Sequence, residues 1–264
     1  MKQSEIRDIP VLQSELLSGQ PALTHFFTLR GETEVGNPYS QWNLCDYSGD
    51  DPVHVTACRQ AVADALGIPI DRMWFPRQVH GDVIAVVDAA TPPALEVDGV
   101  ITRERNLLIG VSTADCVPVL LYDPETGTIA AVHAGWRGTV KHIVKKAVTR
   151  MLDVSGGNAA DIYAALGPSI SPAAFEVGEE VAEAFVTADR AGCVYRDGYV
   201  KPHVDLWQSN VEDLLEAGLQ LDRIDCTPFC TWQNSDRLFS ARRIGVKSGR
   251  IASCLLVKPE YNKS

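Results

Sequence analysis

Two histidines and one cysteine stand at or beside predicted strand ends, where a rigid sheet can present side chains to a cleft. They are His80, Cys116 and His133. One cysteine and two histidines form a ligand set that suits zinc or copper, and three protein ligands leave a fourth position open for water or substrate. The gaps of 36 and 17 residues between them follow no short metal-finger spacing. Spacing alone therefore also allows these residues to be buried structural side chains.

The same residues permit a second interpretation, in which Cys116 is a nucleophile. His133 or His80 would then act as its base, and the neighbouring Asp115 as an orienting group. Thiolate chemistry of this kind suits cleavage of an amide or an ester. The residue types do not separate this interpretation from a metal site.

Several arginines are candidate ligands for an anion in an otherwise acidic chain. The segment Gly135–Thr139 lies between a predicted strand and a predicted helix, where glycines let backbone N–H groups approach an anion and Arg137 adds a cation. An ordinary strand-to-helix turn is the alternative. Near the C-terminus, Arg242, Arg243 and Arg250 form either a ligand-binding group or a solvated basic patch.

Hydrophobic periodicity predicts an α+β fold. Helices are expected at 52–66 between an Asp50–Asp51 cap and Gly67, from an N-cap at Thr139 to about Met151, at 179–188, and at 206–217 after Asp205. Short apolar or branched runs predict strands, at 25–29, within 74–88, and at 98–102, 107–111, 117–122, 128–133, 161–166 and 251–257. Because several strands follow one another directly, we expect packed mixed sheets covered by helices, not a doubly wound parallel sheet.

Composition sets limits on the class of protein. The chain has 264 residues, of which 45% are hydrophobic, and a formal net charge of −10. We expect one domain over residues 1–264 with its core at about 22–258, and no nucleic-acid partner, because the charge repels phosphate backbones. Seven cysteines without a CxxC pair, no apolar leader segment and no membrane-spanning run predict a cytoplasmic protein that does not bind a membrane. The sequence predicts no oligomeric state.

Four segments carry a resemblance to a known family. QVHGDVI, DGVIT, STADCVPVLLYD and AVHAGWRGT resemble the YfiH/laccase-domain family, which was first described as multicopper polyphenol oxidase and is now regarded as zinc-dependent purine nucleoside phosphorylase. The resemblance runs from about His25 to Val257. It implies that His80, Cys116 and His133 hold one zinc ion, with copper as the alternative metal. It also implies a fold with helix, sheet, sheet and helix layers (α/β/β/α).

The resemblance implies two reactions. The first is phosphorolysis of purine nucleosides (adenosine, inosine, guanosine, with methylthioadenosine as a further candidate), releasing the base and ribose 1-phosphate. The second is deamination of adenosine, which also needs a proton-transfer carboxylate, here Asp115 or Glu176. The arginines named above are the candidate phosphate ligands, and Asn43 lies in a segment similar to the family's Asn-Leu segment.

Departures and rival functions stay open. The chain reads Gly31-Glu-Thr-Glu-Val where the family often has Gly-Gly-Val-Ser, and Cys58-Arg59 where it usually has Asn-Arg. One rival is a copper-dependent polyphenol oxidase (laccase), although the chain has only six histidines and no HxH pair. The others are a cysteine hydrolase or amidase linked to peptidoglycan editing, and a non-enzymatic binding protein structured by zinc.

Overall fold

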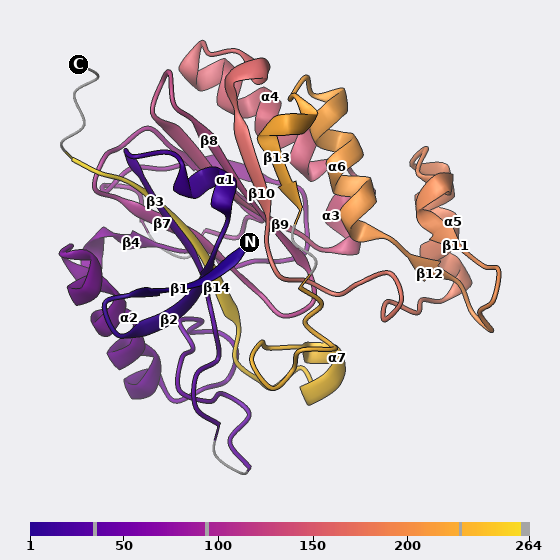
Figure 1. Cartoon of the computed structure of the whole chain (residues 1–264), viewed down its shortest axis with the longest axis horizontal. Coiled ribbons are helices and arrows are strands. Elements are labelled where there is room, and N and C mark those ends of the chain that lie inside the picture. The colour runs from indigo at the N-terminus through magenta and orange to yellow at the C-terminus, as the bar shows by residue number, and fades with distance from the viewer. Residues whose placement is uncertain (34–35, 93–94, 227–228, 260–264) are drawn as a thin grey trace.

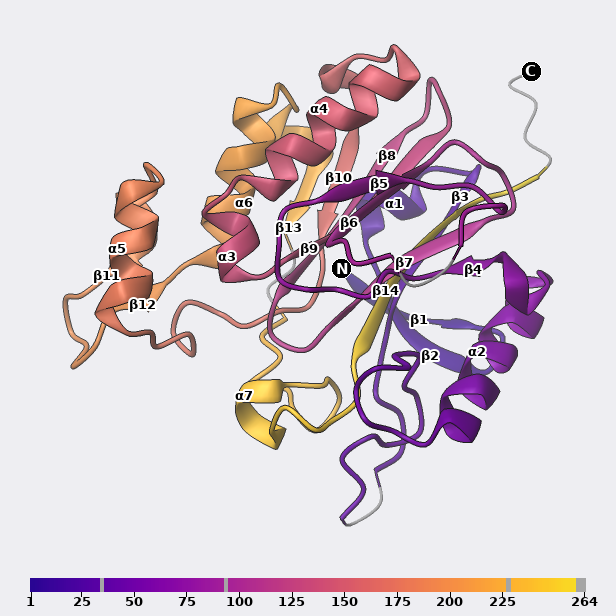
Figure 2. The same ribbon diagram turned by 180° about the vertical axis from the view of Figure 1, so that it is seen from behind.

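Two six-stranded mixed sheets pack face to face and carry helices on their outer faces (Figures 1 and 2). The computed structural model describes residues 1–33, 36–92, 95–226 and 229–259. Glu34 and Val35, which belong to one of the segments that depart from the family pattern, lie outside these residues. The predicted α+β fold with α/β/β/α layers is confirmed.

The first sheet contains both ends of the described chain. Its strands lie in the order β1 (Lys2–Ile6), β2 (Ile9–Gln13), β3 (Leu23–Thr28), β14 (Ile251–Val257), β7 (Leu108–Thr113) and β4 (Met73–Trp74). Only β4 is parallel to its neighbour. This sheet places the segment after β4 and the end of β7 near each other.

The second sheet contains the strands that flank the predicted metal ligands. Its order is β13 (Ile224–Cys226), β10 (Tyr163–Leu166), β8 (Val117–Asp123), β9 (Thr128–Ala134), β6 (Gly99–Thr102) and β5 (Ile84–Val86). β8 is apolar along its length because both of its faces are buried. Leu120 and Tyr122 pack toward the first sheet, whereas Val119 and Leu121 pack in the cluster that includes the covering helices.

One long helix covers the first sheet. α2 (Pro52–Leu66) begins after Asp51, whose side chain accepts a hydrogen bond from the Val53 amide, and it ends at Gly67 in the left-handed conformation. Its inner face, which includes Cys58 and Val62, is buried with side chains from β3 and β14. The predicted helix at 52–66 is confirmed.

Two further helices cover the second sheet, and a third lies to one side. α4 (Ile143–Ser155) and α6 (Leu206–Glu216) pack on its outer face, and Asp205 caps α6 as predicted. α5 (Glu179–Thr187) and the two-stranded sheet of β11 (Val194–Tyr195) and β12 (His203–Val204) form a lateral extension (Figure 1). The short helices are α1 (Glu15–Ser18), α3 (Trp136–Thr139), α7 (Ala241–Ile244), η1 (Ile70–Arg72), η2 (Ala159–Asp161), η3 (Ala191–Cys193) and η4 (Leu221–Arg223). No helix of the described part of the chain is long and apolar enough to cross a membrane.

Two expectations about element boundaries need correction. Thr139 is not the N-cap of the helix that follows β9: it ends the single turn α3, and α4 begins only after His142, whose φ of 56° separates the two helices. The N-terminal hairpin of β1 and β2 was not expected either. Val11 and Leu12 are fully buried, so the core begins well before residue 22.

A buried histidine in β3 predicts that stability falls at acid pH. Burial lowers the pKa of His25 from 6.5 to about 4, and its Nε2 accepts a hydrogen bond from the Ser14 amide, so the folded protein holds it neutral. This stability is therefore present above about pH 6.5 and is lost as the pH falls toward 4, because the unfolded chain binds the proton more tightly. Urea unfolding at pH 7 and at pH 5 measures this effect. Between these two pH values, we expect the free energy of unfolding of a His25→Gln variant to fall by about 2 kcal/mol less than that of the wild type. Equal losses would contradict this assignment.

Candidate metal centre

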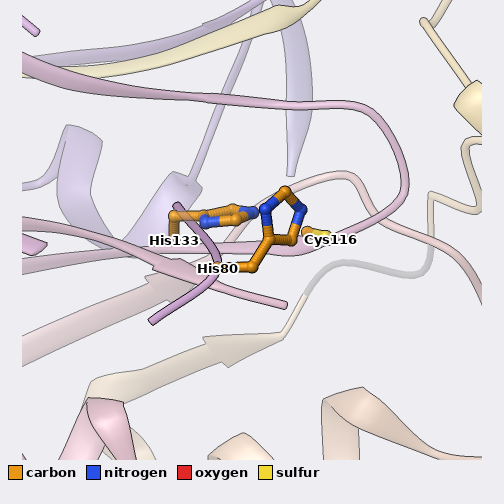
Figure 3. A group of neighbouring side chains, drawn as sticks. All are labelled: His80, Cys116 and His133. Atoms are coloured by element: carbon orange, nitrogen blue, oxygen red, sulfur yellow. The ribbon is translucent and has the colours of Figure 1, made fainter. Parts of the chain in front are cut away.

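His80, Cys116 and His133 converge at one end of the second sheet. His133 lies on β9, Cys116 directly precedes β8, and the pairing of these strands sets Pro118 opposite His133. His80 comes from the loop between β4 and β5. The three candidate ligand atoms lie within 4.8 Å of one another, and the rings of His80 and His133 meet edge to face (Figure 3). Within the described residues this is the one group of three or more potential ligands.

A carboxylate that the sequence analysis missed holds this arrangement together. Asp98, which directly precedes β6, is completely buried. Its Oδ1 accepts hydrogen bonds from His133 Nδ1 at 2.7 Å and from the His80 amide at 2.9 Å. Its Oδ2 accepts from the Gly81 amide at 2.6 Å. These bonds hold the loop in which His80 adopts a left-handed φ of 59°, a conformation that costs a non-glycine residue energy.

The bond from His133 to Asp98 also selects the ligand atom. An ionised carboxylate only accepts, so Nδ1 carries the proton and Nε2 is left for a metal. Burial by itself would raise the pKa of Asp98, but the hydrogen bonds from His133 and the two amides lower it below its ordinary value. Asp98 is therefore a positioning residue with a stable negative charge.

The electrostatics of the bare site favour a thiolate. Burial opposes ionisation of Cys116, but the charge of His133 and hydrogen bonds from His133 and His80 outweigh it and lower the pKa of the thiol. Burial likewise opposes protonation of His133, and the charge of Cys116 together with Asp98 raises its pKa. A soft thiolate beside two imidazoles, with one side open, is the donor set of a catalytic zinc site, so these residues fit zinc.

A glycine is required next to the ligands. A Cβ atom on Gly135 would lie 3.2 Å from both Cys116 Sγ and His80 Cδ2. At Gly138 a Cβ would lie 2.9 Å from the carbonyl oxygen of Gly81. The glycines of the 135–139 segment are thus explained by close packing around the ligands, and α3, with four residues, is too short to form an anion site of its own.

Gly135→Ala is expected to weaken metal binding without unfolding the protein. The residue has a φ of −70°, which alanine adopts freely, so the only new cost is the contact with the two ligands. Overpacking of about 1–3 kcal/mol corresponds to roughly a 5- to 150-fold loss of zinc affinity. Competition with a fluorescent zinc chelator measures this loss, and thermal unfolding of the metal-free protein serves as the control. Unchanged affinity would show that the ligands move apart freely.

A pocket of about 350 Å³ opens on the three candidate metal ligands. Its walls come from the loop before α2, the ends of β7 and β8, and the segment around α7. The lining residues are Tyr47, Gln78, His80, Ser112, Thr113, Ala114, Cys116, His133, Ala241, Val246 and Arg250. Gln78 Nε2 donates to the carbonyl oxygen of Ser112 at 2.7 Å, and Gln78 Oε1 accepts from the Ser112 amide at 2.8 Å. The same Oε1 also accepts from the Tyr47 hydroxyl. The pocket wall is therefore rigid beside the ligands.

Arg250 is the predicted arginine that lines this pocket. Its guanidinium donates to three backbone carbonyls, those of Val246, Ser248 and Gly249. With five donors in a guanidinium, these contacts leave N–H groups for a ligand. Arg250 is thus a cation held in a fixed position beside the three ligands.

The other predicted arginines are exposed and do not belong to the lining of this pocket. Arg137 lies over the ring of Trp136, with its Cζ 4.3 Å from the ring centroid. Arg242 donates to the carbonyl oxygen of Glu176, and Arg243 lies over Trp232 at 4.5 Å.

Asn43 and Asp115 are buried and engaged in structural contacts. Asn43 Oδ1 accepts from the amides of Cys45 and Arg250, so it supports the segment that carries Arg250. Asp115 accepts from the hydroxyls of Thr231 and Ser240 and from the amide of Arg242, which ties the metal loop to α7. The orienting carboxylate of His133 is therefore Asp98, and Asp115 holds α7.

Glu176, the second carboxylate suggested for proton transfer, lies on the surface. It pairs with Lys201 at 3.1 Å, and both side chains are about half exposed or more. Neither it nor Asp115 is among the residues that line the pocket.

Comparisons with known proteins confirm the family resemblance. The family model described as multi-copper polyphenol oxidoreductase laccase matches residues 24–258. A purine nucleoside phosphorylase of Bacteroides thetaiotaomicron is 38% identical over 269 residues, covering 95% of this chain and 97% of the relative. An adenosine deaminase, RL5, from an unknown prokaryotic organism is 42% identical over 237 residues, covering 85% and 90%.

Solved structures share the fold. The YfiH protein of Bacillus licheniformis superposes with a TM-score of 0.85 at 27% identity, covering 95% of this chain and 96% of that one. YlmD from Geobacillus stearothermophilus gives a TM-score of 0.86 at 26% identity, covering 97% and 98%. The relatives named as a purine nucleoside phosphorylase and an adenosine deaminase, in contrast, indicate an enzyme of purine metabolism.

Proposed function

Because the chain belongs to the multi-copper polyphenol oxidoreductase laccase family, we propose that it is a zinc-dependent purine nucleoside phosphorylase with adenosine deamination as a secondary activity. Its substrates would be a purine nucleoside and phosphate, and its products the free base and ribose 1-phosphate. The observation that carries the proposal is the convergence of His80, Cys116 and His133 on a pocket that also contains Arg250. The names of the relatives support the choice of reaction.

The residues of the pocket can take separate roles in phosphorolysis. Phosphate must be held beside the anomeric carbon while positive charge develops on the sugar. Arg250 is the fixed cation suited to this anion. His80, Cys116 and His133 would hold the zinc, which when bound supplies Lewis acidity at an open coordination position. Tyr47 and Gln78 shape the wall on which a nucleoside would lie.

Deamination of adenosine is the second candidate, and the relative named as an adenosine deaminase favours it. The reaction needs a group that transfers protons to the leaving amine. The pocket-lining residues, all within the described part of the chain, include no carboxylate. We therefore propose that deamination is slower than phosphorolysis. Asp115→Asn and Glu176→Gln variants, each assayed for deamination of adenosine, test the two carboxylates suggested for proton transfer.

The rival functions have less support. Multicopper oxidases need several histidine-rich centres, and the described residues contain one group with two histidines; copper in this one site stays an alternative metal. A cysteine hydrolase that uses Cys116, with a role in peptidoglycan editing, predicts activity that survives a chelator. A binding protein structured by zinc predicts unfolding on metal removal and no turnover.

Phosphate-dependent release of base is the test of this proposal. Metal-loaded protein is incubated with adenosine or inosine, with and without phosphate, and the products are separated by chromatography. We expect adenine or hypoxanthine in amounts equal to ribose 1-phosphate, and only with phosphate present. Base release that is independent of phosphate would indicate a hydrolase, and inosine as the sole product from adenosine would indicate a deaminase.

A further inference from the structure

A second group of reactive side chains lies at the start of α2, among residues that the metal centre does not use. Asp50, His54 and Cys58 are spaced four residues apart, which places them on one face of the helix and its capping turn. His54 Nδ1 lies 2.8 Å from Asp50 Oδ2, and His54 Nε2 lies 3.4 Å from Cys58 Sγ. A thiol, an imidazole and a carboxylate thus form a continuous chain of hydrogen bonds.

The carboxylate end of this chain is firmly held. Asp50 is nearly buried, and its Oδ2 also accepts from Asn43 Nδ2 at 2.8 Å. Its Oδ1 accepts from the Asp51 amide. Because the carboxylate can only accept, it requires the proton of His54 to be on Nδ1. In neutral His54 the Nε2 atom is then an acceptor that faces the thiol of Cys58, and this thiol also lies within donating distance of the Gln41 carbonyl oxygen, at 3.3 Å.

The surroundings of Nε2 also suit the charged form of His54. The carbonyl oxygen of Gln41 lies 3.2 Å from Nε2. Once Nε2 takes the proton of Cys58, it becomes a donor, and this carbonyl can accept from it. Burial raises the pKa of the Cys58 thiol, so the resting group keeps its proton and needs a base in order to react.

The thiol adjoins a pocket that is separate from the one at the metal ligands. Its volume is about 510 Å³, within the range of small-molecule sites. Cys58, His54, Ala57 and Ala61 of α2 form one wall, and Trp42 belongs to the facing segment. The indole Nε1 of Trp42 is buried and has no hydrogen-bond partner among the described residues. Trp42 therefore contributes apolar surface to the pocket wall.

We propose that Cys58 is a nucleophilic thiol, that His54 is its general base and Asp50 the positioning residue, and that the pocket admits small uncharged carbon electrophiles. In the reaction the sulfur forms a bond to carbon, and the leaving group departs with its electron pair. The proton of the thiol passes to His54 Nε2. The chain would thus carry a site of covalent modification distinct from its metal centre.

The proposal is tested by alkylation of the zinc-loaded protein with iodoacetamide, in which iodide is the leaving group. Peptide mass spectrometry gives the rate at each cysteine. We expect Cys58 to react ahead of Cys45, Cys193 and Cys254, which are also buried. His54→Gln is expected to slow Cys58 by about tenfold or more, since a general base contributes at least that much. Gln60→Ala, an exposed position on the same helix, is the matched control and should leave the rate unchanged.

Two further measurements keep the proposal falsifiable. The wild-type rate at Cys58 should fall in D2O, because the proton moves in the same step, and this result needs no variant. His54→Gln should keep its melting temperature and its phosphorolysis rate, which separates a lost base from a lost fold. A Cys58 that reacts as slowly as Cys254, or as fast in His54→Gln as in wild type, would overturn the proposal and leave a structural hydrogen bond.

Discussion

Cys116→Ala is expected to lose zinc and phosphorolysis together while the protein stays folded. The substitution removes the one thiolate of the donor set, and two histidines hold zinc poorly by themselves. Loss of a residue that merely orients a ligand lowers metal affinity by about 10- to 100-fold, so loss of a ligand should exceed 100-fold. Metal analysis after dialysis, followed by the chromatographic assay of base release, measures both quantities.

A matched cysteine provides the control for this variant. Cys226 is exposed and lies on β13, the edge strand that β10 separates from β8. Cys226→Ala should therefore keep one zinc per chain and the wild-type rate. If Cys116→Ala also keeps its zinc and its rate, the assignment of Cys116 as a ligand is wrong. If it keeps its zinc but loses its rate, Cys116 is a nucleophile.

Asp98→Asn is expected to have the second largest effect, although residue 98 touches no metal. The four hydrogen bonds at this carboxylate all come from N–H donors, those of Val79, His80, Gly81 and His133. An amide replaces one accepting oxygen with a donor, so some of these N–H groups lose their partner inside the protein. We expect zinc affinity to fall by about 10- to 100-fold and the free energy of unfolding by about 1–3 kcal/mol.

The two consequences of Asp98→Asn are measured separately. Chelator competition gives the zinc affinity, and urea unfolding of the metal-free protein gives the stability. Restoration of wild-type turnover by excess zinc would identify Asp98 as a positioning residue. A rate that stays low at full zinc occupancy would instead assign the carboxylate a direct part in the reaction.

The regular parts of the fold were predictable from sequence because each signal is local. Strand β14 matches its predicted range, and the boundaries of α2 follow from Asp51 and Gly67. The N-terminal hairpin was not predicted, because its strands are short and Pro10 interrupts the pattern. It becomes visible only when β2 pairs with β3.

The centre itself was only partly predictable. The three candidate ligands were singled out by residue type at predicted strand ends, and the family resemblance then favoured a metal site over buried structural residues, since gaps of this length obey no spacing rule. Asp98 was missed because it was taken only as the first residue of the predicted strand at 98–102, and a strand prediction does not show which ligands its side chain will meet. Asp115 was predicted as the orienting group because it precedes Cys116 in sequence. In the structure its backbone has a φ of 90°, and its side chain accepts hydrogen bonds from the α7 segment.

The group on α2 had a signal that sequence reasoning could have used. Asp50, His54 and Cys58 recur every four residues at the start of the helix predicted at 52–66, and such positions are neighbours on its surface. The facing pocket and the carbonyl of Gln41 come from a loop whose path the sequence does not specify. Only the structure brings these parts together.

The central claim, that the His80–Cys116–His133 site carries out phosphorolysis with one zinc ion, is tested most directly by titration. Protein stripped with a chelator is given increasing zinc, and phosphate-dependent release of base from inosine is followed by chromatography. We predict that the rate rises linearly and stops rising at one zinc per chain. A full rate in the metal-free protein, or no base release with one zinc bound, would contradict this account.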